Sequence, residues 1–149
     1  MCLRHASRAN AAANIQLPTI NLNSLLKYLR MAFRFLRFKV FQDAKFFHRK
    51  IVFLTKDFPV EFYYLKDQIR RSSLSIVLSI AEGSAKTSDK DFNRYIEIAM
   101  GSGNETAAGL DVSLQEGLIL QVEYDEAIKI CENVVNQLGG FSKKLRVGN

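Results

Sequence analysis

Apolar side chains recur at helical spacing from residue 38 to near the C-terminus. In the first segment they follow one another at steps of three or four residues until Pro59, which disfavours helical backbone in the residue before it. Its apolar members are Val40, Ala44, Phe47, Ile51, Leu54 and Phe58. A second helix is predicted from about Glu61 to Ala81, ending near Gly83, and its second half is apolar on most sides. Such a helix lies at the centre of a bundle or is covered by another subunit.

A third helix is predicted after Ser88, which can accept a hydrogen bond from a free backbone N–H while Asp91 reaches back. Apolar residues keep helical spacing from Phe92 to Leu114, and the helix is expected to end at Gly117. Glycines inside a helix reduce its stability, so those of this segment predict close approach of a neighbouring helix, with a kink as the alternative. They are Gly101, Gly103 and Gly109.

A fourth helix is predicted from about Glu123, because acidic residues fill its first turn, where the helix dipole favours them. Its apolar side chains are Ile128, Cys131, Val134, Val135, Leu138 and Phe141. Short connections between long helices favour an all-α, antiparallel, up-down four-helix bundle. We expect one domain over residues 31–149, preceded by a basic leader over residues 1–30 that is disordered or loosely helical. The leader also resembles an organellar transit peptide, which is the alternative interpretation.

Charge is unevenly distributed between the two parts of the chain. The formal net charge is +6, yet residues 1–56 hold 11 Lys and Arg against a single acid, and the remainder holds 10 against 14. This asymmetry indicates an anionic partner such as nucleic acid, or a solvated arm without one. Residues 9–26 lack charge but contain too many polar side chains to span a bilayer, so we expect no membrane association.

Catalytic and metal-binding patterns are missing from the sequence. His5 and His48 have no second metal ligand at a suitable spacing. Cys2 and Cys131 match neither a metal site nor a disulfide pattern, which favours a reducing, cytoplasmic compartment. The segment 83–87 lacks the glycines of a phosphate loop and follows a helix rather than a strand. We therefore expect no enzyme, no catalytic residue, no metal and no cofactor.

Two sets of polar residues are candidates for function. The first is a network that fixes helix register or subunit contacts, or binds a ligand, and a buried guanidinium within it would need a carboxylate partner. Its members are Gln68, Arg70, Arg71, Glu82 and Glu105, with the two glutamates as the candidate partners. The second is a basic surface that could neutralise phosphates, or that is merely a solvated face. Its members are Lys86, Lys90 and Arg94, at helical spacing, with Lys66, Arg34, Arg37 and Lys39.

An ordered series of short motifs resembles a known protein family. The motifs are Phe58-Pro59, Gln68-Ile69-Arg70-Arg71, Ile80-Ala81-Glu82-Gly83, and Ala99-Met100-Gly101-Ser102 followed by Glu105. They are similar to those of the four-helix-bundle proteins that include proteins encoded within intervening sequences of bacterial 23S ribosomal RNA genes. The resemblance covers about residues 38–145, with departures at Tyr64, Ser79 and Gly103.

The resemblance implies a homo-oligomer, typically five bundles arranged as a barrel, without enzymatic activity. A distant relative, the accessory protein of diversity-generating retroelements, binds nucleic acid and a reverse transcriptase through a basic surface, which implies the same classes of partner here. Two functions stay open. One is an oligomer that binds RNA or DNA through its basic residues. The other is a scaffold that recruits a protein and has no role with nucleic acid.

Overall fold

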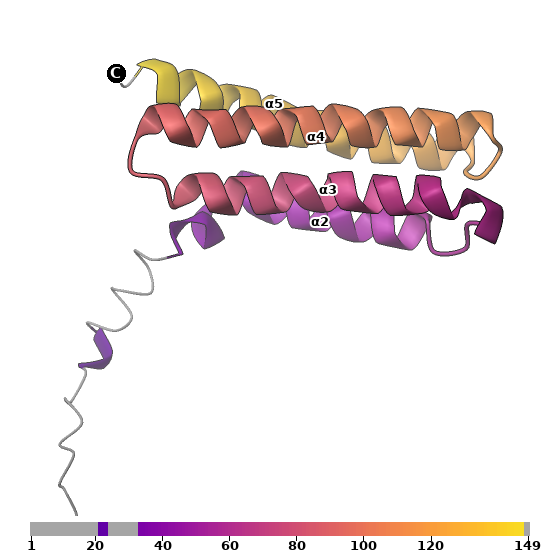
Figure 1. Cartoon of the computed structure of the whole chain (residues 1–149), viewed down its shortest axis with the longest axis horizontal. Helices are drawn as coiled ribbons and strands as arrows, with labels where there is room; N and C mark the ends of the chain where they lie inside the picture. The colour runs from indigo at the N-terminus through magenta and orange to yellow at the C-terminus, as the bar shows by residue number, and fades with distance from the viewer. Residues whose placement is uncertain (1–20, 24–32, 148–149) are drawn as a thin grey trace, which may run out of the picture.

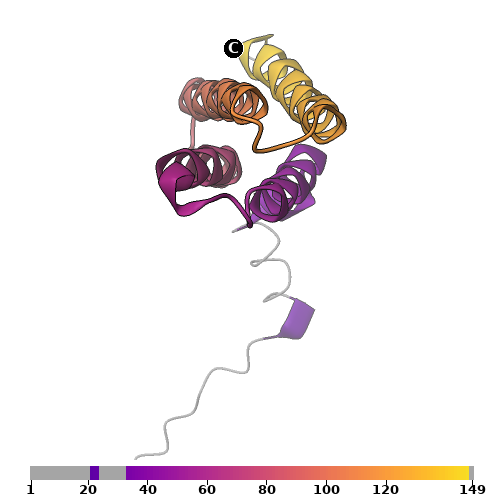
Figure 2. The ribbon, with the colours of Figure 1, turned by 90° about the vertical axis from the view of Figure 1, so that its right-hand side faces the viewer.

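Four long helices lie side by side in a computed structural model that describes residues 21–23 and 33–147 (Figure 1). Short turns join neighbouring ends, and in the end-on view the helices occupy the corners of a square (Figure 2). The elements of this region are η1 (Arg34–Arg37), α2 (Lys39–Leu54), η2 (Val60–Phe62), α3 (Tyr63–Ser84), α4 (Asp89–Gln115) and α5 (Gln121–Val147). The described part of the chain contains no strand, so the all-helical fold class is confirmed. The expected leader, residues 1–30, lies outside the described residues except for 21–23.

The apolar side chains that set the helical period point into one core. The contacting pairs α2–α3, α3–α4, α4–α5 and α2–α5 close a ring, and the packing of α3 on α4 is the most extensive. Side chains from all four helices are almost fully enclosed, which is the main source of stability for such a bundle. The largest of them are Phe47, Ile51, Ile69, Ile76, Ile80, Ile96, Leu110, Val134 and Leu138.

The predicted helix ends of α4 are confirmed by their capping bonds. The backbone N–H of Asp91 donates to Ser88 Oγ at 3.1 Å, which satisfies one of the free N–H groups of the first turn. The Asp91 carboxylate accepts from the hydroxyl of Ser88 at 2.7 Å rather than from its backbone N–H. Gly117 has a φ of +69°, a left-handed conformation that glycine adopts without steric cost.

Helix α2 ends earlier than the apolar pattern predicts. It stops at Leu54, whereas the spacing extends to Phe58. The Arg70 guanidinium donates to the carbonyl oxygen of Val52 at 2.9 Å and to Thr55 Oγ1 at 2.8 Å, so α3 supplies partners at the end of α2. Phe58 still packs in the core, from the turn that follows the helix.

Close helix approach at glycine is confirmed at two of the three expected positions. A Cβ at Gly109 would lie 2.5 Å from Cγ1 of Ile69, and one at Gly103 would lie 2.7 Å from Cγ2 of Val135. Val135 thus fills the space at Gly103, one of the departures from the resembling family. At Gly101 a Cβ would meet nothing within 4 Å, so close approach is the wrong explanation for this glycine.

His48 on α2 is a partly buried titratable group whose Nδ1 lies 2.8 Å from Ser73 Oγ of α3. Burial, and secondarily the charge of Arg70, lowers its pKa below the usual 6.5. Between the folded pKa and about 6.5 the unfolded chain binds more protons, so stability falls as the pH is lowered through this window. We expect His48→Gln to reduce this acid sensitivity, measured as melting temperature from pH 7.5 to 5.0. An unchanged pH profile would contradict this.

Candidate nucleic-acid interface and polar network

Helices α2 and α4 begin, and α3 and α5 end, at the same end of the bundle (Figure 1). Basic residues gather in and beside these terminal turns. Six of the seven basic residues expected from the sequence belong to this basic end. Three further cations in the last turns of α5 join them, which the sequence analysis missed. The complete set is Arg34, Arg37, Lys39, Lys86, Lys90, Arg94, Lys143, Lys144 and Arg146.

Arg34 has a structural role at this end. Its Nε donates to the carbonyl oxygen of Ser84 at 2.6 Å, in the last turn of α3, where helical carbonyls have no partner within the helix. Its guanidinium lies 5.3 Å from the ring centre of Phe92, close enough for a cation–π contact. Arg34 therefore joins η1 to the turn between α3 and α4.

Several other cations of the basic end have nearby carboxylates. Lys39 pairs with Asp43 on the next turn, and Arg146 lies 2.5 Å from Glu97. Lys86 lies 3.5 Å from Glu82 and 4.5 Å from the ring centre of Tyr95. The Tyr95 contact, followed by Glu82, raises the pKa of Lys86, so this lysine stays charged throughout the physiological range.

Lys90 and Arg94 are the cations of α4 that are open to an external anion. Both are exposed, and neither has a hydrogen-bond or ion-pair partner in the part of the chain that the structure describes. They are one helical turn apart, so both face the same side of α4. An anion reaching this surface would not have to break an existing ion pair.

Lys66 does not belong to the basic end. Its Nζ donates to the carbonyl oxygen of Lys56 at 2.7 Å, at the opposite end of the bundle. Acids are frequent at that end in the last turns of α4, the turn after it and the first turns of α5, namely Asp111, Glu116, Glu123, Asp125 and Glu126. The two ends of the bundle therefore differ in charge, although most cations of the basic end come from the part of the sequence after residue 56.

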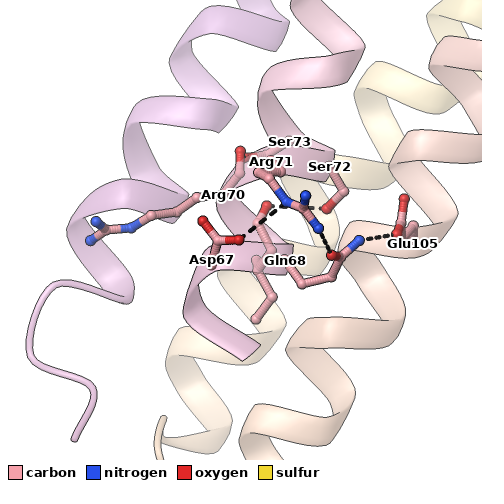
Figure 3. A network of polar contacts seen from close by, with 8 residues as sticks. Asp67, Gln68, Arg70, Arg71, Ser72, Ser73 and Glu105 are labelled. Carbon is pink, nitrogen blue, oxygen red and sulfur yellow. Dashed lines mark hydrogen bonds and ion pairs between the residues drawn. The ribbon is translucent and has the colours of Figure 1, made fainter. Parts of the chain in front are cut away.

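The expected polar network forms around Arg71 (Figure 3). Its guanidinium donates to Gln68 and lies 3.2 Å from Asp67, while the amide of Gln68 donates to Glu105 on α4. These contacts cross from α3 to α4 on the molecular surface. The Asp67 contact is an i, i+4 pair within α3 that the sequence analysis did not include.

Arg70 and Glu82 lie apart from this network. The Arg70 side chain points away from Arg71 toward the end of α2 (Figure 3). Glu82 lies at the other end of α3, about 20 Å along the helix axis from Gln68. A hydrogen bond with Tyr95, and then Lys86, lowers the pKa of its carboxyl group.

Arg70 and Arg71 should therefore differ in their effect on stability. We expect Arg70→Met to lower the free energy of unfolding by about 1.5 kcal/mol, because it leaves the buried Thr55 hydroxyl and the Val52 carbonyl without this donor. Arg71→Met should change it by less than about 0.5 kcal/mol, because its ion pair is exposed. Urea denaturation measures both, and equal losses would contradict the assignment.

The described residues offer little for redox or metal chemistry. Among residues 21–23 and 33–147, no group of three or more His, Cys, Asp or Glu side chains is placed to hold a metal ion. Burial raises the pKa of the Cys131 thiol to about 11, so it is protonated at neutral pH and a poor nucleophile. No helix of this described part is long and apolar enough to cross a membrane.

The fold places the chain in the class of all-helical, four-helix-bundle proteins. The profile of the 23S rRNA-intervening sequence protein family matches residues 37–140, and the chain belongs to this family. The resemblance noted from the short motifs is thereby confirmed. No protein of curated function matches the chain.

A solved structure supports the same fold. It is a crystal structure of a protein of unknown function from the S23 ribosomal protein family of Bacteroides thetaiotaomicron. The two chains are 25% identical, and the superposition has a TM-score of 0.64. It covers 70% of this chain and 98% of the other.

Proposed function

We propose that this protein is a non-enzymatic, cytoplasmic oligomer that binds RNA or DNA through the basic end of its bundle. The observation that supports this most is the meeting, at one end of the bundle, of cations from η1, α2, the α3–α4 turn, α4 and α5. At the other end, acids dominate where α4 ends and α5 begins. A cationic surface of this kind contacts the phosphates of a nucleic acid whatever its base sequence. Lys90 and Arg94 on α4, with Lys143 and Lys144 on α5, are the principal contacts, since Arg34, Lys39, Lys86 and Arg146 already bind groups of the protein.

We further propose that the chain folds as an antiparallel bundle and associates with itself, as a pentamer by analogy with the resembling family. Exposed apolar side chains on α3 and α4 support self-association, because a large exposed apolar patch usually marks a contact surface. They are Leu74, Leu78, Ile98 and Val112, each at least 40% exposed. The Arg71 network lies on the same pair of helices and would set the register between subunits. Native mass spectrometry tests this part, and a monomer at micromolar concentration would contradict it.

Salt dependence of binding tests the nucleic-acid proposal. We expect the full chain to bind labelled RNA and DNA with little sequence preference, and with an affinity that falls steeply between 50 and 200 mM salt. Fluorescence anisotropy measures this. The absence of salt-sensitive binding would remove the proposal. A protein partner that copurifies regardless of nuclease treatment and of Lys90→Glu or Arg94→Glu would instead support the scaffold.

A further inference from the structure

The outer side of α2 presents two exposed phenylalanines among cations. Phe46 and Phe53 are 56% and 66% exposed, although side chains of this type are mostly buried. They are seven residues apart, so they lie on the same side of the helix about 10 Å from each other along its axis. Arg49 falls on the same side by helical phase, and Lys45 is the exposed cation next to Phe46. Lys56, in the turn after α2, contacts the ring of Phe53. We call these five residues the aromatic–cationic face.

The cations of this face are largely available to an external anion. Arg49 is exposed and has no hydrogen-bond or ion-pair partner within the described residues. Lys56 lies 4.6 Å from the ring centre of Phe53, and its nearest carboxylate, Asp57, is exposed at 3.6 Å. Lys45 contacts only the ring of Phe41, at 5.2 Å. Cations held beside exposed rings form a surface that suits a chain of aromatic bases and phosphates.

Acidic groups beside this face already have partners. Asp43, the only acid of α2, accepts hydrogen bonds from Lys39 and Gln137. In the groove toward α5, Glu126 pairs with Lys50 at 2.8 Å and Glu123 accepts from a backbone N–H at 2.8 Å. Phe46 and Phe53 border the grooves toward α5, where these carboxylates are unfavourable for phosphate. The phosphates of a strand would therefore follow the outer side of α2, where Arg49 lies.

We propose that the aromatic–cationic face binds single-stranded RNA or DNA, an inference that rests on the proposed function and specifies its ligand. Bases stack on Phe46 and Phe53, whose separation matches the rise of about three stacked nucleotides. Phosphates contact Arg49, Lys45 and Lys56. A duplex binds this face less well, because its bases are stacked on each other and cannot offer their faces to the rings.

A linear strand fits this surface better than an anionic membrane does. A strand needs only the surface of α2 and the edge of the groove that Phe53 lines, whereas a flat bilayer would also cover the acidic first turns of α5. Repulsion from Glu123 and Asp125 opposes that approach. Membrane binding is therefore an outcome that the experiment must separate from strand binding.

The absence of tryptophan from the chain permits a direct test. Phe53→Trp in the full chain introduces a single reporter, and we expect oligo(dT) of about 16 nucleotides to quench its fluorescence by stacking. Asn104→Trp, at an exposed position of α4, the helix diagonally across the bundle from α2 (Figure 2), is the matched control and should not be quenched. Quenching equal in both variants, or in neither, would overturn the proposal. A blue shift with phosphatidylglycerol vesicles but no quenching by oligo(dT) would also overturn it, in favour of a membrane surface.

A second pair of variants keeps apolar area while removing the aromatic faces. We expect Phe46→Leu/Phe53→Leu to bind oligo(dT) at least about tenfold more weakly, with duplex binding at the basic end unchanged. Circular dichroism verifies that the double variant folds. If the full chain binds nucleic acid but this variant binds oligo(dT) with unchanged affinity, binding at the aromatic–cationic face is refuted while the proposed function stands. If no nucleic acid binds the full chain, both are refuted.

Discussion

Replacing Gly83 with alanine is expected to lower the free energy of unfolding by about 2 kcal/mol. The new Cβ would lie 2.7 Å from Cβ of Tyr95 and 2.7 Å from Cδ2 of Phe92, both on α4. The Phe92 ring has little room to rotate, because it packs against Phe141 at 5.0 Å between ring centres. The Cβ of Tyr95 moves only with its backbone, so α3 and α4 would have to separate. This cost exceeds the gain of up to about 1 kcal/mol from the better helix former.

Gly101→Ala is the matched control for Gly83→Ala. It also replaces a helical glycine, but its Cβ would enter open space. We expect it to raise the free energy of unfolding by about 0.5 to 1 kcal/mol, because alanine restricts the unfolded chain and favours the helix. Urea denaturation followed by circular dichroism compares the two variants. If Gly83→Ala proved as stable as Gly101→Ala, the close approach of α3 and α4 at this point would be wrong.

Reversing the charge of Lys90 or Arg94 is expected to weaken RNA and DNA binding about tenfold at low salt. Each reversal should also reduce the slope of log affinity against log salt by about one, because one phosphate contact and its released counterion are lost. Anisotropy titrations of Lys90→Glu and Arg94→Glu over several salt concentrations measure both quantities.

Lys66→Glu distinguishes the loss of a direct contact from a change of net charge. It makes the same change of net charge at the opposite end of the bundle. We expect only a small loss of affinity and an unchanged slope for this variant. Equal effects of Lys66→Glu and Lys90→Glu would show that general attraction, rather than the basic end, accounts for binding.

Prediction of the polar sites from sequence succeeded only in part. The Arg71, Gln68 and Glu105 side chains meet, yet the adjacent Arg70 turns to the end of α2, and Glu82 contacts Lys86. Successive side chains of a helix point in directions about 100° apart around its axis, so neighbours in sequence contact different elements. Sequence adjacency therefore could not assign their partners.

The amino-acid sequence by itself determined the four helices, most of their ends and the family. Helical period, the Ser88 cap and the left-handed Gly117 act over a few neighbouring residues, so they are readable without the fold. Only the tertiary structure decided which cations share a surface. It excluded Lys66 and added Lys144 and its neighbours at the end of α5, because residues far apart in sequence come together only when the helices pack side by side.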